Sequence, residues 1–120
     1  MREEEAPETP SQTIVNAVET RFHVDAKGRR IEVRQLNALQ VYRLNKVLGA
    51  AANNAAAADM ATLACTVIKI DAQPVAMPAT EREVEFLIKQ LGFEGFAAAA
   101  EALKKFAPVD EEAELETAKN

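Results

Sequence analysis

The chain has 120 residues, of which 48% are hydrophobic, 28% are charged and only 5% are aromatic. These values are ordinary for one soluble globular domain with a modest core built from alanine, valine, leucine and isoleucine. The single cysteine, Cys65, excludes an intramolecular disulfide, and no apolar run approaches the roughly 20 residues of a membrane-spanning helix.

The net charge of −5 is unevenly distributed. Residues 1–12 carry four acids and one base, residues 108–120 carry five acids and one base, and the chain between them carries twelve bases and ten acids. Acidic ends of this kind are typical of solvated segments, although a tail that docks on a basic partner is the alternative. We expect a flexible acidic arm at 1–16, one globular domain at 17–107 and an acidic disordered tail at 108–120. The acidic start also lacks the apolar segment of a signal peptide.

Residues 18–34 alternate between apolar and charged side chains with the period of a β-strand, and a turn from Asp25 to Gly28 interrupts them. Gly28 is able to adopt the positive φ that closes such turns. The pattern predicts a β-hairpin with one apolar face and one charged face. The apolar face would hold Val18, Thr20, Phe22, Val24, Ile31 and Val33, and the charged face Glu19, Arg21, His23, Arg30, Glu32 and Arg34.

Helical signals follow the hairpin. Asn37 and Gln40 have the spacing of a capping box, and apolar residues at helical spacing continue to Gly49, a natural helix end. After an alanine-rich stretch, a second helix is predicted to begin near Ala55.

Between residues 68 and 75 the sequence predicts a short extended segment or small hairpin. Thr80 and Glu83 then form a second capping box, which starts a third helix ending at Gly92. A fourth helix is predicted from about Glu94 to Phe106. The expected fold is α+β and mainly helical, with an N-terminal β-hairpin followed by about four short helices and an extended segment between helices two and three.

Residues that could perform chemistry are few. His23 is the only histidine, which excludes a multi-histidine metal site within one chain, and we expect it to be solvated on the strand. Cys65 is expected to be a small buried residue. The acids Glu81, Glu83 and Glu85 stand where the helix dipole favours negative charge. The sequence therefore indicates no enzyme, no metal and no cofactor.

The hairpin is locally basic, with Arg21, Lys27, Arg29, Arg30 and Arg34, but Glu19, Asp25 and Glu32 are interspersed. A solvated strand face is one interpretation, and a docking patch for an acidic protein is another. Nucleic acid is disfavoured, because the chain is acidic and carries no known nucleic-acid-binding signature. If the face binds a partner, its candidate residues are Arg21, Arg29, Arg30 and Arg34.

Apolar side chains are the second candidate surface for binding a partner. The alanine blocks at 50–52, 55–58 and 97–100 are either helix filler or surfaces for close packing against another chain's helix. Phe86 falls off the main apolar stripe of the third helix and could anchor such a helix. Phe93 and Phe96 are the remaining candidate anchors.

In order and spacing of these features, the chain resembles the small tail assembly chaperones of long-tailed bacteriophages and prophages. The matching segments are D-A-K-G-R-R-I-E-V-R-Q-L-N-A-L-Q-V-Y-R-L and A-T-L-A-C-T-V-I-K-I-D-A-Q-P-V-A-M-P-A-T-E-R-E-V-E-F-L-I-K-Q-L-G-F-E-G-F-A-A-A-A-E-A-L. The resemblance covers residues 20–103, about two-thirds of the chain, and leaves out the acidic ends.

The resemblance implies a non-enzymatic protein that coats the long helical tape measure protein until tail tube subunits polymerise along it. Such proteins act in the host bacterial cytoplasm, self-associate, are absent from the mature virion, and are often made in two lengths by ribosomal frameshifting. Expected partners are therefore the tape measure protein, the tail tube protein and further copies of the chain, with no nucleic acid, membrane or cofactor. The alternative function is a minor structural tail or head-completion protein that stays in the virion.

Overall fold

The computed structural model describes residues 18–106. In this range, a four-stranded antiparallel sheet in the order β1-β2-β3-β4 accompanies three α-helices. The fold is α+β, as predicted, whereas the predicted arm at 1–16 and tail at 108–120 lie outside the described residues. The strands are β1 (Arg21–Val24), β2 (Arg30–Val33), β3 (Val67–Ile70) and β4 (Gln73–Pro74), and the helices are α2 (Ala38–Leu48), the 3₁₀ helix η1 (Gly49–Asn53), α3 (Ala55–Cys65) and α4 (Glu81–Leu103).

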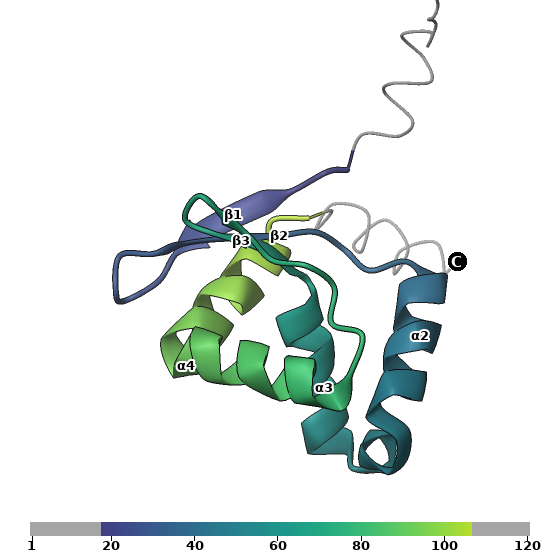
Figure 1. The fold of residues 1–120 in the computed structure, drawn as a ribbon. Coiled ribbons are helices and arrows are strands. Elements are labelled where there is room, and N and C mark those ends of the chain that lie inside the picture. The colour runs from purple at the N-terminus through teal and green to yellow at the C-terminus, as the bar shows by residue number, and fades with distance from the viewer. Residues whose placement is uncertain (1–17, 107–120) are drawn as a thin grey trace, which may run out of the picture.

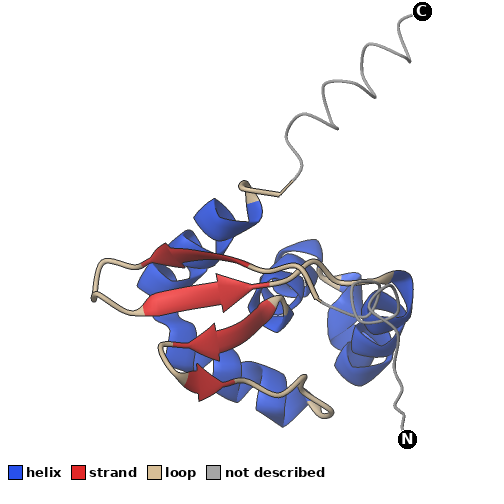
Figure 2. Cartoon of the chain, turned by 90° about the horizontal axis from the view of Figure 1, so that it is seen from above, coloured by secondary structure: helices blue, strands red, loops and turns tan. Residues whose placement is uncertain are grey.

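The elements form two layers. The sheet lies at the top of Figure 1, α3 and α4 lie beneath it, and α2 stands at the side of the molecule. Figure 2 shows the strands from above, with helices behind them. Among residues 18–106, helices therefore cover only one face of the sheet, an arrangement that is common for antiparallel sheets.

The predicted hairpin is present, but the prediction for the faces of β1 is wrong. His23 pairs with Ile31, and Arg21 pairs with Val33. Directly paired residues share a sheet face, and Ile31 and Val33 are fully buried. Arg21 and His23 therefore face the helices, while Phe22 lies on the outer face.

The register of this hairpin follows from its turn. The backbone N–H of Asp25 donates to the carbonyl of Arg29 at 2.8 Å, and that of Gly28 donates to the carbonyl of Asp25 at 2.9 Å. With these bonds, the two strands pair in a register one residue away from the one that the alternating pattern predicts. A shift of one residue moves every side chain of a strand to the opposite face of the sheet. The two large apolar residues of the central strand β2 then occupy the core.

Helix α2 begins as predicted. The Asn37 side chain accepts from the Gln40 N–H at 2.8 Å, and the Gln40 side chain accepts from the Asn37 N–H at 2.9 Å. Gly49, at φ 56°, ends the helix, in a backbone region that favours glycine. The next helix, α3, begins at the predicted Ala55 with Asn54 as its N-cap.

The extended segment between the second and third predicted helices is a small hairpin. Strand β3 begins at Val67, one residue earlier than expected. The two-residue turn contains Asp71 at φ 56°, a conformation that aspartate tolerates better than most residues. Because β4 pairs only with β3, it forms one edge of the sheet.

The third and fourth predicted helices are assigned as one helix, α4, which corrects the predicted number of helices to three among residues 18–106. The predicted boundary survives as a kink, because Gly92 has φ 65° and ψ −178°, outside helical geometry. Figure 1 shows the two halves of α4 running in different directions. The second half packs through Ala98, Ala99 and Ala102, which brings its backbone close to the sheet.

The core has two parts. One joins β2 and β3 to both halves of α4, and the other joins α2 to α3 and the start of α4. The half-buried Ile88 packs against both parts. No helix within residues 18–106 is both long and apolar enough to cross a bilayer.

Candidate partner-binding groove

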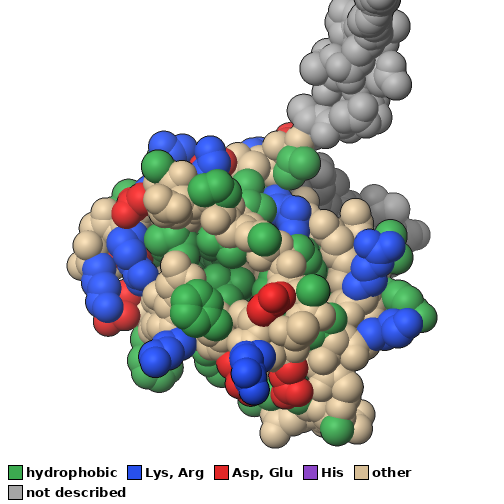
Figure 3. All heavy atoms as spheres, viewed as in Figure 1, with side chains coloured by type: hydrophobic (Ala, Val, Ile, Leu, Met, Phe, Trp, Pro, Cys, Tyr) green, Lys and Arg blue, Asp and Glu red, His purple; other side chains and the backbone are tan. Residues whose placement is uncertain are grey.

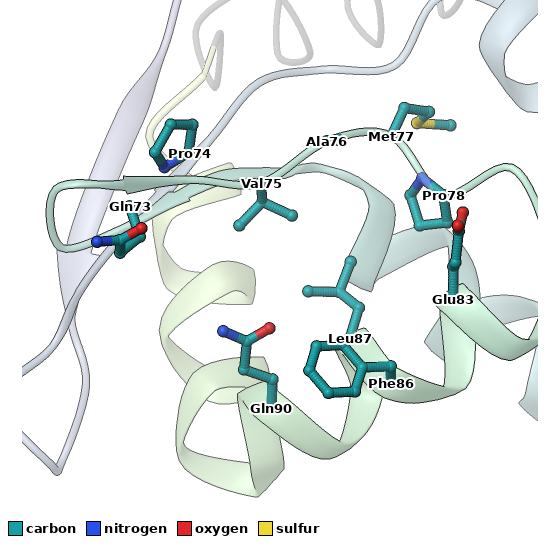
Figure 4. Close-up of a pocket in the computed structure, with 10 residues that line it drawn as sticks. All are labelled: Gln73, Pro74, Val75, Ala76, Met77, Pro78, Glu83, Phe86, Leu87 and Gln90. Carbon is teal, nitrogen blue, oxygen red and sulfur yellow. The ribbon is translucent and has the colours of Figure 1, made fainter.

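A groove lies between the extended segment that includes β4 and the first half of α4. Its volume is about 360 Å³, and Figure 3 shows apolar side chains in a hollow between the strand layer and the helices. Leu87, which is 3% exposed, and the half-buried Val75 face each other across it (Figure 4). The lining residues are Gln73, Pro74, Val75, Ala76, Met77, Pro78, Glu83, Phe86, Leu87 and Gln90.

The strand wall of the groove is fixed by backbone hydrogen bonds. The N–H of Asp71 donates to the carbonyl of Arg30 at 2.8 Å, and the Asp71 carboxylate accepts from the N–H of Arg30 at 2.9 Å. One step further, the N–H of Val75 donates to the carbonyl of Ile68 at 2.8 Å. Pro74 fits the edge position, since proline has no N–H to donate to a neighbouring strand.

The start of α4 fixes the far end of the groove. Thr80 Oγ1 accepts from the N–H of Glu83 at 3.2 Å, and the Glu83 carboxylate accepts from the N–H of Ala79 at 2.7 Å. Only the first bond of the predicted capping box is therefore present, because the Glu83 carboxylate accepts from Ala79 instead of from the N–H of Thr80. The loop from Pro78 onward is held against the helix as a result.

The three candidate phenylalanines have different surroundings. Phe86 lies beside Leu87 at the rim of the groove and is 67% exposed. Phe93, just after the kink, is 87% exposed. Phe96 is half-buried and packs against the core. The rings of Phe86 and Phe93 are therefore exposed, whereas the ring of Phe96 packs against the core.

Arg29 is a structural residue of the fold. Its Nε donates to Asp25 Oδ2 at 2.7 Å, while its two Nη atoms donate to the carbonyls of Gln90 at 2.9 Å and Leu91 at 2.7 Å. A cation at the carbonyl end of a helical segment is favoured by the helix dipole. Arg29 thus ties the hairpin turn to the first half of α4 where that half ends.

The other three candidate arginines do not share a surface with it. Arg30 stacks on the Phe22 ring at 3.8 Å on the outer sheet face, beside Glu32, Lys69 and Asp71. Arg21 lies over the ring of Phe106 at 4.8 Å. Arg34 is half-buried, with Nη2 3.6 Å from the sulfur of Met77. The four arginines therefore do not form one basic face, and Arg30 on the outer sheet face has acidic neighbours. Partner binding by any of these arginines stays a prediction.

Cys65 is 1% exposed. Burial raises the pKa of its thiol to about 11, although the charge of Arg34 acts in the opposite direction. The thiol is thus protonated at neutral pH, and only the thiolate is a strong nucleophile.

His23 faces the second half of α4 and lines a small pocket with Glu94 and Glu101, which differs from its predicted place on a solvated face. No cluster of three or more metal-ligating side chains occurs among residues 18–106.

The comparisons with known proteins add nothing to this geometry: no family model, no curated protein and no solved structure matches the chain.

The sequence pointed to Phe86 through its position off the apolar stripe, but it did not indicate the groove. The opposite wall comes from Val75, Met77 and Pro78, whose distance from α4 is set by the sheet. The available signal was an extended segment between two prolines immediately before a capping box.

Proposed function

We propose that this protein is a non-enzymatic tail assembly chaperone, which covers apolar helical stretches of a phage tape measure protein before the tail tube forms. The observation that carries the proposal is the groove with Leu87 on its apolar floor and Phe86 exposed at its rim, followed by Phe93 at 87% exposure. Exposed aromatic side chains beside an apolar hollow are typical of protein-binding surfaces.

The shape of the groove favours an amphipathic helix as its ligand. A helix presents anchors at positions i, i+3, i+4 and i+7, which a groove between a helix and an extended segment can accept. The rim offers the neutral polar side chains of Gln73 and Gln90 and the single carboxylate of Glu83. Recognition would thus depend mainly on apolar contact, which suits a partner with long apolar stripes.

The size of the contact supports reversible coating. Complete burial of one phenylalanine stabilises a complex by about 2 kcal/mol, and ordering and association offset part of that gain. One such site would bind weakly. Many copies along one long helical protein would bind with avidity, and tube subunits could still displace them one at a time.

The proposal is tested by co-expressing the tape measure protein with the chain and measuring the fraction of tape measure protein that stays soluble. The double variant F86S/F93S removes the two exposed rings of α4, and we expect it to lose most of the solubilising effect. V24S is the matched control, because Val24 is 51% exposed on the outer sheet face, away from the groove. Equal solubilisation by F86S/F93S and by the unaltered chain would contradict the proposal.

Mass spectrometry of purified particles distinguishes the chaperone from the alternative, a minor structural protein. A chaperone is absent from mature virions, whereas a tail or head-completion protein is retained in them at a fixed copy number.

A further inference from the structure

A second exposed surface lies on helix α2, away from the groove. The side of α2 opposite the buried Leu44 and Leu48 carries Leu39, Tyr42, Arg43 and Lys46. Their spacing of i, i+3, i+4 and i+7 places them on one helical face. Leu39 is 52% exposed and Tyr42 is 60% exposed, and the ammonium group of Lys46 lies 5.5 Å from the centre of the Tyr42 ring. We call these four residues the α2 outer face.

The α2 outer face combines apolar and basic side chains. Helix α2 has no acidic residue and two bases, so nothing on the helix itself neutralises Arg43 or Lys46. An aromatic ring, an aliphatic side chain and two cations are adjacent. This combination suits a ligand that presents carboxylates together with a few apolar side chains.

We propose that the α2 outer face binds the acidic C-terminal segment of the same molecule, residues 108–120. That segment has five acids and one base, which complement the two cations of the face. It also contains Val109 and Leu115, which can cover Tyr42 and Leu39. The other acidic segment, residues 1–12, contains no valine, leucine, isoleucine or aromatic residue. It therefore lacks such side chains to cover Tyr42 and Leu39.

The length of the chain permits this contact. Fourteen residues follow Phe106, and when extended they span up to about 46–50 Å, which is as long as the largest dimension of the molecule, 46 Å. A tether of this length gives the segment an effective concentration in the millimolar range. An intramolecular contact of modest strength is therefore populated without a second copy.

Tyr42 provides a specific signal for the test, since the chain has one tyrosine and no tryptophan. Its fluorescence is measured in the full-length chain during titration with acrylamide at low salt. The first variant neutralises the C-terminal segment by E111Q/E112Q/E114Q/E116Q. The matched control makes the same change in charge at the other end by E3Q/E4Q/E5Q/E8Q. A second pair compares R43Q/K46Q on the face with R82Q/K89Q on exposed positions of α4.

We expect quenching of Tyr42 to increase roughly twofold in E111Q/E112Q/E114Q/E116Q and in R43Q/K46Q, because the tethered segment is released. The two control variants should behave as the unaltered chain. Raising the salt from about 0.01 M to about 1 M, which shortens the Debye length from about 30 Å to about 3 Å, should also expose Tyr42.

Three results would overturn the proposal. The first is equal quenching in the unaltered chain and in E111Q/E112Q/E114Q/E116Q. The second is an equal increase when either end is neutralised, which would indicate a general effect of charge. The third is protection that disappears on dilution, because it would assign the contact to the acidic segment of a second copy. None of these readouts involves the groove, so the outcome is independent of the proposed function.

Discussion

Asp25 and Arg29 show how single residues position the elements around the groove. The Asp25 side chain is fully buried, and it accepts hydrogen bonds from the N–H of Lys27 at 2.9 Å, the N–H of Arg29 at 2.8 Å and Arg29 Nε at 2.7 Å. Because Arg29 also binds two carbonyls of α4, one carboxylate orders both the hairpin turn and its link to the helix. The sequence placed Asp25 in a turn and Arg29 among the candidate partner-binding residues, but it did not indicate that the two side chains bind each other.

The protonation of Asp25 leads to a prediction for stability against pH. Burial alone would raise the pKa of Asp25, but the hydrogen bonds and charge of Arg29 and the Lys27 N–H lower it below the ordinary value of 3.8. The native state then binds fewer protons than the unfolded state near this pH. The contribution of Asp25 to the free energy of unfolding is therefore complete above about pH 4 and is lost as pH falls through the lower native pKa.

We expect D25N to lower the free energy of unfolding by about 3 kcal/mol at pH 7, since it leaves Arg29 without its charged partner. This difference from the unaltered chain should shrink as pH falls below about 4. Urea unfolding at several pH values measures it, with D59N, at an exposed position of α3, as the control. A difference that stays constant from pH 7 to pH 2 would show that the charge of Asp25 does not contribute.

At the scale of elements, local signals were predictable and register was not. The caps at Asn37 and Thr80 and the end at Gly49 depend on neighbours a few residues away, so the sequence contains them directly. The faces of β1 depend on how the turn at Asp25 closes, and the exposed Phe22 is accommodated by stacking with Arg30. The alternating pattern alone could not supply that information.

Gly92 determines the shape of α4. Its φ of 65° with ψ of −178° belongs to a region that residues with a side chain occupy at a cost of about 1–3 kcal/mol. An added Cβ would lie 3.1 Å from Glu94 Oε1, the mobile end of a side chain, so backbone strain rather than crowding would dominate.

We expect G92A to lower the free energy of unfolding by about 2 kcal/mol, measured by urea denaturation. A97S, at an exposed position in the second half of α4, should cost about 0.5 kcal/mol. If G92A instead raised stability by about 1 kcal/mol, as glycine-to-alanine changes do inside a regular helix, the kink would not be a requirement of the fold.

At the scale of the whole molecule, the exposed apolar surface divides into regions with different chemistry. The groove is apolar with a nearly neutral rim, the α2 outer face is apolar and cationic, and the outer sheet face mixes bases with acids. The α+β class was predictable from composition and periodicity, whereas partner binding by Phe86, Phe93 and Phe96 stays a prediction. The groove was not, because it requires the Gln73–Pro78 segment and α4 to meet in three dimensions.

We propose that the groove beside Phe86 holds an apolar helix of the tape measure protein. The most direct measurement places a photo-crosslinking amino acid at position 86 of the tagged chain during phage assembly and identifies the crosslinked protein and peptide by mass spectrometry. Positions 22 and 42 on the other two surfaces serve as controls. We predict crosslinks from position 86 to apolar helical peptides of the tape measure protein, and few or none from the controls. Crosslinks to that protein from a control position but none from position 86 would place its binding site outside the groove and overturn the proposal.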